Sequence, residues 1–215
     1  RYSEVHLMEA KKLIAMMTVL EKLKCNTRHS WTTSGRHESI AEHSWRLALL
    51  EYFVKDEFPE ADIDKIILMC LIHDIGEAFT GDIPAFLKTK EHEDTEDSAV
   101  SGFVSSLPAP YKEELTALFS EMNALSTPEA KIFKALDKME ALLQHNEADI
   151  KTWLPLEYDL NLIYGTEETS FSEYMQTLKK TLNDDSIKKI NASFVGRDDL
   201  GPPSPAPVGR DDPGP

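Results

Sequence analysis

A short run of ionisable residues follows the most apolar stretch of this sequence. His73 and Asp74 come directly after residues 66–72 (IILMCLI), and Glu77 and Asp82 follow soon afterwards. An unpaired carboxylate or imidazole is costly to bury beside such a stretch, so these groups need strong partners. Imidazole and carboxylate are both good ligands for divalent cations, so an adjacent pair of them indicates a metal site.

Two residues elsewhere in the chain could complete that site. His43 lies in the first turns of one predicted helix, and Asp137 lies beside the apolar stripe of a later one. With His73 and Asp74 they would supply two imidazoles and two carboxylates. This set leaves open positions on a six-coordinate metal, as a catalytic site requires. It accepts iron, manganese, cobalt, nickel or zinc, and the sequence does not choose among them.

Two further carboxylates are expected beside the metal. Glu77 follows His73 by one helical turn and shares its face, while Asp82 lies in the turn of residues 81–84, just past the helix end. These carboxylates suit the roles of general base and general acid. They could instead hold a second, hard cation such as magnesium. The sequence leaves both alternatives open.

Helices must position these side chains, because apolar residues recur at helical spacing along most of the chain. Ser39 and Glu42 form a Ser-x-x-Glu capping box, and Thr127 with Pro128 marks a second helix start. No alternating strand pattern is present. The sequence therefore predicts an all-α fold, with helices over residues 8–23, 39–58, 60–79, 91–107, 111–125, 128–147 and 170–190 and a loop over residues 26–36.

Composition narrows the class of protein. The chain has 215 residues, 41% of them hydrophobic and 28% charged, which is typical of one soluble globular domain. The net charge of −15 argues against nucleic acid or an anionic membrane as a partner. Two cysteines are too few for a disulfide framework, and no apolar run approaches a membrane span. We therefore expect a cytoplasmic protein.

The composition changes near the C-terminus. Residues 201–207 (GPPSPAP) cannot form a core, and the sequence Val-Gly-Arg-Asp-Asp occurs at residues 195–199 and again at 208–212. We expect residues 1–190 to form a single domain and residues 191–215 to form a Pro/Gly-rich tail. This tail would be flexible or derived from cloning, with no chemistry of its own.

The order and spacing of the predicted metal ligands resemble the HD-domain phosphohydrolase superfamily, whose signature is a distal His, a His-Asp pair and a later Asp. Within that superfamily the sequence looks most like the 5'-deoxynucleotidases, both bacterial and human-type. The likeness covers roughly residues 8–190. It rests on the motifs Arg28-His29-Ser30-Trp31, residues 38–43 (ESIAEH), 73–77 (HDIGE), 80–84 (TGDIP), 129–131 (EAK) and 136–138 (LDK).

The resemblance implies a single HD-domain helical bundle that removes the 5'-phosphate from deoxynucleoside monophosphates. Arg28 would hold the phosphate, and Lys88 is a candidate for a further phosphate contact. Trp31 would pack near the sugar and exclude a 2'-hydroxyl. In the human-type relatives, the positions of Glu77, Asp82 and the Ile83 backbone resemble a second metal site. The family also suggests a homodimer.

Other functions remain open from the sequence. The chain could hydrolyse another phosphorylated nucleotide or a small phosphorylated metabolite, or it could be a catalytically silent metal-binding scaffold. The intact Glu77 and Asp82 count against the scaffold, because a silent domain has no chemical need of them. No role is assigned to the remaining histidines, among them His29 and His145, because they lie in polar contexts.

Overall fold

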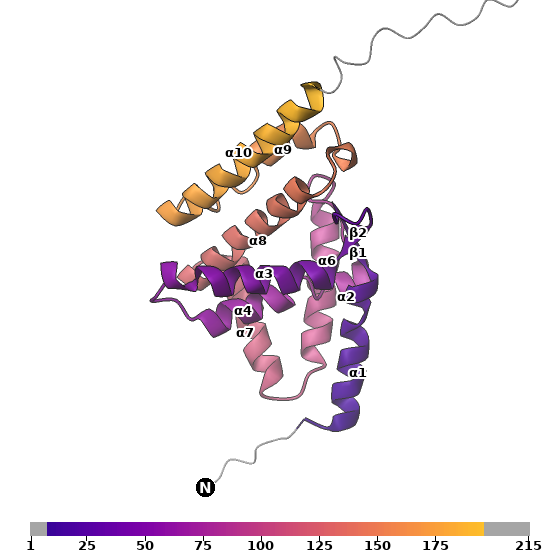
Figure 1. The fold of residues 1–215 in the computed structure, drawn as a ribbon. Coiled ribbons are helices and arrows are strands. Elements are labelled where there is room, and N and C mark those ends of the chain that lie inside the picture. The colour runs from indigo at the N-terminus through magenta and orange to yellow at the C-terminus, as the bar shows by residue number, and fades with distance from the viewer. Residues whose placement is uncertain (1–7, 196–215) are drawn as a thin grey trace, which may run out of the picture.

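Three helices pack against one another at the centre of the molecule, as a computed structural model describing residues 8–195 shows (Figure 1). These three helices are α3, α4 and α8. In chain order the elements are α1 (Ala10–Leu20), α2 (Lys22–Cys25), β1 (Thr27–Trp31), β2 (His37–Ser39), α3 (Ile40–Val54), α4 (Ile63–Ile72), α5 (Glu77–Thr80), α6 (Lys90–Ser105), α7 (Tyr111–Ala124), α8 (Pro128–Glu147), α9 (Glu157–Ile163) and α10 (Glu173–Val195). Short 3₁₀ turns lie at Lys55–Glu57 and Ile150–Thr152. The predicted all-α class is confirmed.

The core lies between these three helices. Leu47 of α3, Ile66 and Met69 of α4, and Ile132 and Leu136 of α8 are almost completely buried. Ile66 and Met69 are three residues apart and Ile132 and Leu136 four apart, so each of these two pairs lies on one face of its helix. Burying one such side chain contributes roughly 1.5–3 kcal/mol, so this face fixes how the three helices sit together. The same helices, or their ends, carry all four predicted metal ligands.

The helix starts predicted from the sequence are present. The Ser39 hydroxyl accepts a hydrogen bond from the Glu42 amide at 3.2 Å, and the Glu42 carboxylate accepts one from the Ser39 amide at 2.8 Å. The Thr127 hydroxyl accepts from the Ala130 amide at 3.2 Å, with Pro128 at the first helical position of α8. These caps set where α3 and α8 begin, and therefore which faces His43 and Asp137 occupy.

The prediction of a loop over residues 26–36 was wrong. Strands β1 and β2 form a small antiparallel hairpin in which Thr27 pairs with Ser39 and Trp31 with His37. The strands are too short for an alternating pattern to be visible in the sequence. The Gln144 carboxamide on α8 donates a hydrogen bond to the Trp31 carbonyl at 2.6 Å, so tertiary contact helps to hold the hairpin.

The single helix expected over residues 60–79 is also interrupted. Helix α4 ends at Ile72, and the chain continues through tighter turns in which the Glu77 amide donates to the Asp74 carbonyl at 3.0 Å. Gly76 lies where α6 passes closely: a β-carbon there would be 2.5 Å from Cγ of Glu96. The close approach of α6 therefore requires glycine within the turn that follows the His-Asp pair.

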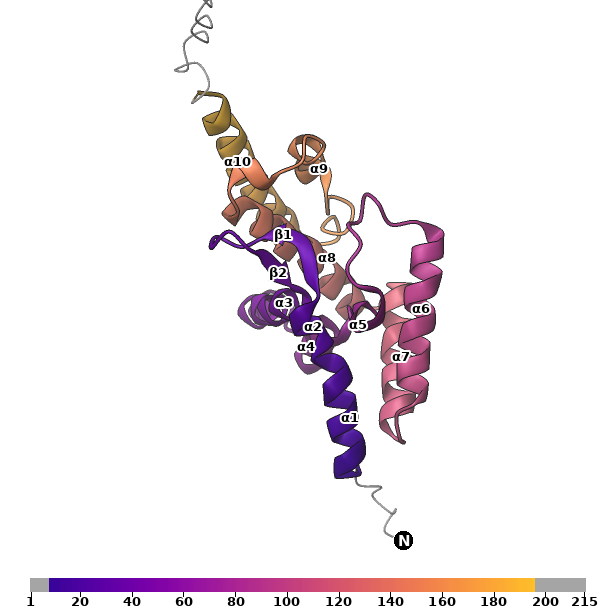
Figure 2. The same ribbon diagram turned by 90° about the vertical axis from the view of Figure 1, so that its right-hand side faces the viewer.

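The remaining helices surround this core. Helices α6 and α7 form an antiparallel hairpin at one side (Figure 2), and α10 packs along α8. The sequence did not predict α9. Helix α10 continues to Val195, past the predicted domain boundary at residue 190, and residues 196–215 of the predicted tail lie outside the described residues. Within residues 8–195, no helix is long and apolar enough to cross a membrane.

The carboxylate of Glu51 on α3 is fully buried in the core, and neither of its oxygens has a hydrogen-bond partner among the described residues. Burial raises its pKa to about 7 from an ordinary value of 4.5. The folded state therefore favours the protonated form. The associated stability is fully present below the unfolded-state pKa and is lost as the pH rises through 7.

We expect Glu51→Gln to stabilise the metal-free protein, and to do so by about 1–3 kcal/mol more at pH 8 than at pH 5, because glutamine carries no charge to bury. Urea unfolding at the two pH values measures the difference. An equal effect at both pH values would mean that Glu51 is not the titrating group.

Candidate metal centre and active site

The two predicted imidazole ligands lie side by side, with their Nε2 atoms free. The Nδ1 atom of His73 donates to the Cys70 carbonyl at 2.9 Å, and Nδ1 of His43 donates to the Glu140 carboxylate. These bonds hold one proton on each Nδ1, so each Nε2 can bind a cation when it carries no proton. Burial and Arg28 oppose the protonated form of His43, but Glu140 and Asp137 outweigh them and raise its pKa to about 9. In the described part of the chain, neither Nε2 atom has a hydrogen-bond partner although both are buried.

Two carboxylates converge on these nitrogens. Oδ2 of Asp74 lies 3.0 Å from Nε2 of His73 and 4.0 Å from Nε2 of His43. Oδ1 of Asp137 lies 3.3 Å from Nε2 of His43 and 3.7 Å from Nε2 of His73. Helix α3, the end of α4 and helix α8 thus bring four donor atoms together. His43, His73 and Asp74 have donor atoms close enough together to hold a metal ion. Asp137 lies against both imidazole nitrogens, so these four residues would hold a divalent cation.

The charge state of the carboxylates supports this interpretation. Burial alone would raise the pKa of Asp74, but His73, His43 and Arg28 outweigh burial and hold the pKa well below its usual range. Burial likewise opposes ionisation of Asp137, and Lys134 together with His43 holds that pKa well below normal. Both carboxylates are therefore ionised at neutral pH and able to bind a cation.

A buried carboxylate that the sequence analysis missed lies behind the imidazoles. Glu140 is fully buried, and besides His43 it accepts a hydrogen bond from Nε of Arg46 at 2.6 Å. Nη1 of Arg28 is 3.8 Å from Glu140 and 4.0 Å from Glu38. Glu140 thus contacts the predicted metal ligand His43 and lies beside the predicted phosphate ligand Arg28. Its position three residues after Asp137, on the same face of α8, was a signal available in the sequence.

Glu77 and Asp82 both line the cavity into which Asp74 and Asp137 point. Glu77 is buried, and its Oε2 has no hydrogen-bond partner among the described residues. Burial, followed by the charges of Asp74 and Asp82, raises the pKa of Glu77 to about 10. Asp82 accepts a hydrogen bond from the His29 amide at 3.1 Å, and burial raises its pKa as well.

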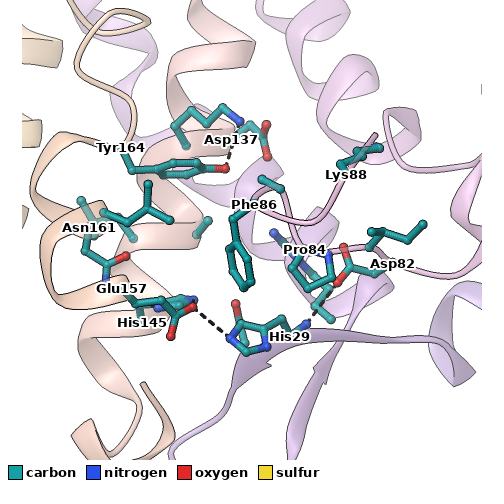
Figure 3. A pocket seen from close by; sticks show the side chains of 18 of the residues that line it. His29, Asp82, Pro84, Phe86, Lys88, Asp137, His145, Glu157, Asn161 and Tyr164 are labelled. Atoms are coloured by element: carbon teal, nitrogen blue, oxygen red, sulfur yellow. Dashed lines mark hydrogen bonds and ion pairs between the residues drawn. The ribbon is translucent and has the colours of Figure 1, made fainter. Parts of the chain in front are cut away.

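The cavity has a volume of about 390 Å³ (Figure 3). Of the predicted site residues, Arg28, Asp74, Glu77, Asp82, Ile83, Lys88 and Asp137 line it. His29 and His145, to which the sequence analysis gave no role, also line it, together with Glu157. Residues separated by more than a hundred positions meet there, so no local pattern could have indicated the grouping.

Two predicted substrate contacts have partners of their own. Nζ of Lys88 lies 2.5 Å from a carboxylate oxygen of Glu96, although Lys88 still lines the cavity. Trp31 is not among the lining residues, and its ring packs on His37 with 4.1 Å between the ring centroids. The structure therefore brings Lys88 to the other site residues and does not bring Trp31 there.

We expect Glu140→Gln to weaken metal binding about 10–100-fold, because a neutral amide makes His43 a poorer ligand than a carboxylate does. Competition with a chromophoric chelator measures the affinity. Glu147→Gln is the matched control, since Glu147 also pairs with Arg46 but is 42% exposed and does not contact His43. Equal losses in the two variants would contradict a specific role for Glu140.

Comparison with known proteins identifies the family of this chain. The family model described as HD domain matches residues 20–179. The chain is 32% identical over 142 residues to 5'-deoxynucleotidase HDDC2 of Homo sapiens, covering 64% of this chain and 69% of the human protein. It is 30% identical over 147 residues to 5'-deoxynucleotidase hdd1 of Schizosaccharomyces pombe, covering 65% and 73% of the two chains.

Solved structures are similar over a larger share of the chain. A predicted metal-dependent phosphohydrolase from Magnetospirillum magnetotacticum superposes with a TM-score of 0.69 at 28% identity, covering 85% of this chain and 97% of that one. A conserved hypothetical protein from Pyrococcus furiosus gives a TM-score of 0.65 at 27% identity, covering 80% and 99%. The resemblance inferred from the sequence motifs is confirmed, and the chain belongs to the HD-domain family.

Proposed function

We propose that this protein is a metal-dependent phosphomonoesterase that converts deoxynucleoside 5'-monophosphates to deoxynucleosides and phosphate. The observation that carries the proposal is the convergence of two orphaned imidazoles and two ionised carboxylates at a cavity that also holds Arg28. The names of the human and fission-yeast relatives supply the substrate class. A cavity of about 390 Å³ lies within the range of small-molecule sites.

His43, His73, Asp74 and Asp137 would hold the metal, which is iron, manganese, cobalt, nickel or zinc in this proposal. When bound, a divalent cation supplies Lewis acidity, which stabilises negative charge developing on a phosphoryl group and makes water more acidic. Arg28 binds the phosphate through charge-assisted hydrogen bonds, and the carboxylates of Glu38 and Glu140 hold its guanidinium in place. Lys88 offers a second positive charge at the cavity wall.

Two carboxyl groups move the protons of the reaction. Glu77 orients the attacking water and takes its proton, and Asp82 gives a proton to the departing 5'-oxygen. The P–O bond to the sugar breaks as the new bond to water oxygen forms. In the metal-free protein Glu77 is protonated at neutral pH, since its pKa is raised to about 10. A cation held by the neighbouring ligands would lower that pKa, and Glu77 would then be ionised and able to take the proton.

A second cation is the alternative role for the same carboxylates. Glu77, Asp82 and the Ile83 carbonyl would then hold a hard ion such as magnesium, for which oxygen ligands are suited. Asp82 lies close enough to Glu77 for its charge to raise the pKa of Glu77, and such proximity is compatible with shared cation binding. The behaviour of a Glu77 variant, described below, separates the two roles.

Assembly and location are further parts of the proposal. Trp45, Leu49, Tyr52 and Phe53 form an exposed apolar stripe along α3, with Trp45 60% and Phe53 76% exposed. Such a stripe supports a homodimer, in line with the family. Cys25 and Cys70 are both free thiols, which supports a reducing, cytoplasmic location. The strongly negative net charge supports a small-molecule substrate over nucleic acid or a membrane surface.

The direct test is phosphate release from cobalt- or manganese-loaded protein. We expect turnover of dAMP and dGMP, slower turnover of AMP, and little release from di-, tri- or cyclic nucleotides. A malachite-green assay measures the phosphate. If no monophosphate is hydrolysed while metal analysis shows a filled site, the proposed activity is wrong. Release from nucleoside diphosphates or cyclic nucleotides instead would assign the site to another phosphorylated nucleotide.

Asp74→Asn should abolish metal binding and turnover together, because a neutral amide replaces an ionised ligand that contacts both imidazoles. Inductively coupled plasma analysis measures the bound metal, and the phosphate assay measures turnover. Full turnover by a variant that retains no metal would refute the assigned ligand set.

Glu77→Gln should lower kcat by about 10²–10⁴-fold and leave the primary metal in place, if Glu77 handles a proton. Glu93→Gln is the matched control, because Glu93 lies at the cavity with an exposed side chain. Measured metal content decides between the roles: loss of one of two bound ions in Glu77→Gln would favour the second-cation alternative. An unchanged kcat would remove Glu77 from the reaction.

A further inference from the structure

The cavity continues well beyond the metal centre. Helix α8 lines it from Lys134 through Asp137 and Ala141 to His145. At 1.5 Å of rise per residue, His145 lies about 12 Å along the helix axis from Asp137. The phosphate-binding part of the cavity is at the Asp137 end, next to Arg28. The His145 end, which we call the distal end, is therefore available to the rest of a substrate.

A cluster of polar side chains from three separate elements closes the distal end. Glu157 of α9 accepts a hydrogen bond from Nε2 of His29 on β1 at 2.9 Å, and Nε2 of His145 on α8 is 3.8 Å from the same carboxylate oxygen. The carboxamide nitrogen of Asn161 lies 3.5 Å from Nδ1 of His145. The proposed phosphoester chemistry uses none of these side chains.

Position and burial both favour a binding role for this cluster. Glu157 is 2% exposed, and its other oxygen accepts from the Leu154 amide at 2.6 Å, so its orientation is fixed. Burying a carboxylate is costly, and two imidazoles plus a backbone amide compensate that cost. His29 remains 24% exposed and faces the cavity, where Figure 3 shows its ring beside Phe86 and Glu157.

Apolar and aromatic groups lie between the distal end and the metal centre. Phe86 projects into the cavity, with its ring centroid 5.7 Å from that of His29 and the two planes at 87°. Ala141 and Leu142, which come between Asp137 and His145 on α8, also line the cavity. Small-molecule sites combine apolar or aromatic walls with a few precisely placed polar groups, and this part of the cavity has Phe86 as well as the polar cluster.

From this geometry we infer that the distal end is a nucleobase subsite, in which Glu157, held by His29 and His145, accepts a hydrogen bond from an amino or ring N–H group of the base. The inference rests on the proposed function, because it places the phosphate at Arg28. Each common nucleobase carries such a donor at its edge. The subsite therefore accepts several bases but rejects a substrate without one.

The test compares deoxynucleoside 5'-monophosphates with 2-deoxyribose 5-phosphate, which has no base. The wild type should give a kcat/KM for dAMP, dGMP, dCMP or dTMP at least about tenfold above that for the sugar phosphate, because only the nucleotides have a base that can donate a hydrogen bond to Glu157. Glu157→Gln should reduce this ratio by about tenfold. His29→Ala, on a different element, should reduce it in the same direction.

Asp159→Asn is the matched control, since it makes the same carboxylate-to-amide change on an exposed position of α9. It should leave the ratio unchanged, and thermal unfolding shows whether each variant is folded. A wild-type ratio near one, or equal reductions in Glu157→Gln and Asp159→Asn, would overturn the inference while the phosphatase activity stands.

Calorimetric titration of the metal-loaded protein with deoxyguanosine and with 2-deoxyribose provides a second readout without turnover. Wild type should bind the nucleoside more tightly, and Glu157→Gln should lose most of that preference. If no phosphomonoester is hydrolysed, the proposed function fails by itself, and these titrations still decide the subsite. Equal binding of the two compounds by the wild type would refute the nucleobase subsite.

Discussion

The buried contact between Glu140 and His43 is the constraint on which the rest of the site depends. Glu140 fixes the tautomer of His43, and the same carboxylate binds Arg46 and lies beside Arg28. Its negative charge is tolerated in the core only because an imidazole and two guanidinium groups surround it. The proposed metal ligand His43 and the proposed phosphate ligand Arg28 thus share one carboxylate partner. A change at Glu140 therefore alters both halves of the site together.

Helix α8 is the element that spaces the functional groups. Asp137 faces the proposed metal centre, and Glu140 lies behind the imidazole of His43. His145, about two helical turns after Asp137, lies at the distal end of the cavity. Because the helix is rigid, the separation between metal centre and distal end is fixed by the number of residues between them. The proposed substrate spans this separation, with its phosphate at one end and its base at the other. In this proposal α8 therefore sets the distance between the phosphate-cleaving end of the site and the end that binds the base.

Much of the fold, and the residues proposed to form the metal centre, could be predicted from the sequence. Capping residues Ser39 and Thr127 located the starts of α3 and α8, since caps are local and depend on side chains a few positions apart. The apolar stripes of the same helices indicated which faces are buried. Polar residues on those buried faces point toward the same core, which explains why the sequence pattern could group His43, His73, Asp74 and Asp137 as predicted ligands.

By itself, the sequence determined which imidazoles and carboxylates are the predicted metal ligands, and which helices carry them. Only the tertiary structure decided which distant groups share the cavity. It placed Glu157 against His29 and His145, and it turned Trp31 away to pack on His37. It also ended α4 at Ile72, and it packed α6 against Gly76 in the turn that follows. The physical reason is range: helix period and caps act over a few residues, whereas a cavity is formed by packing between segments far apart in the chain.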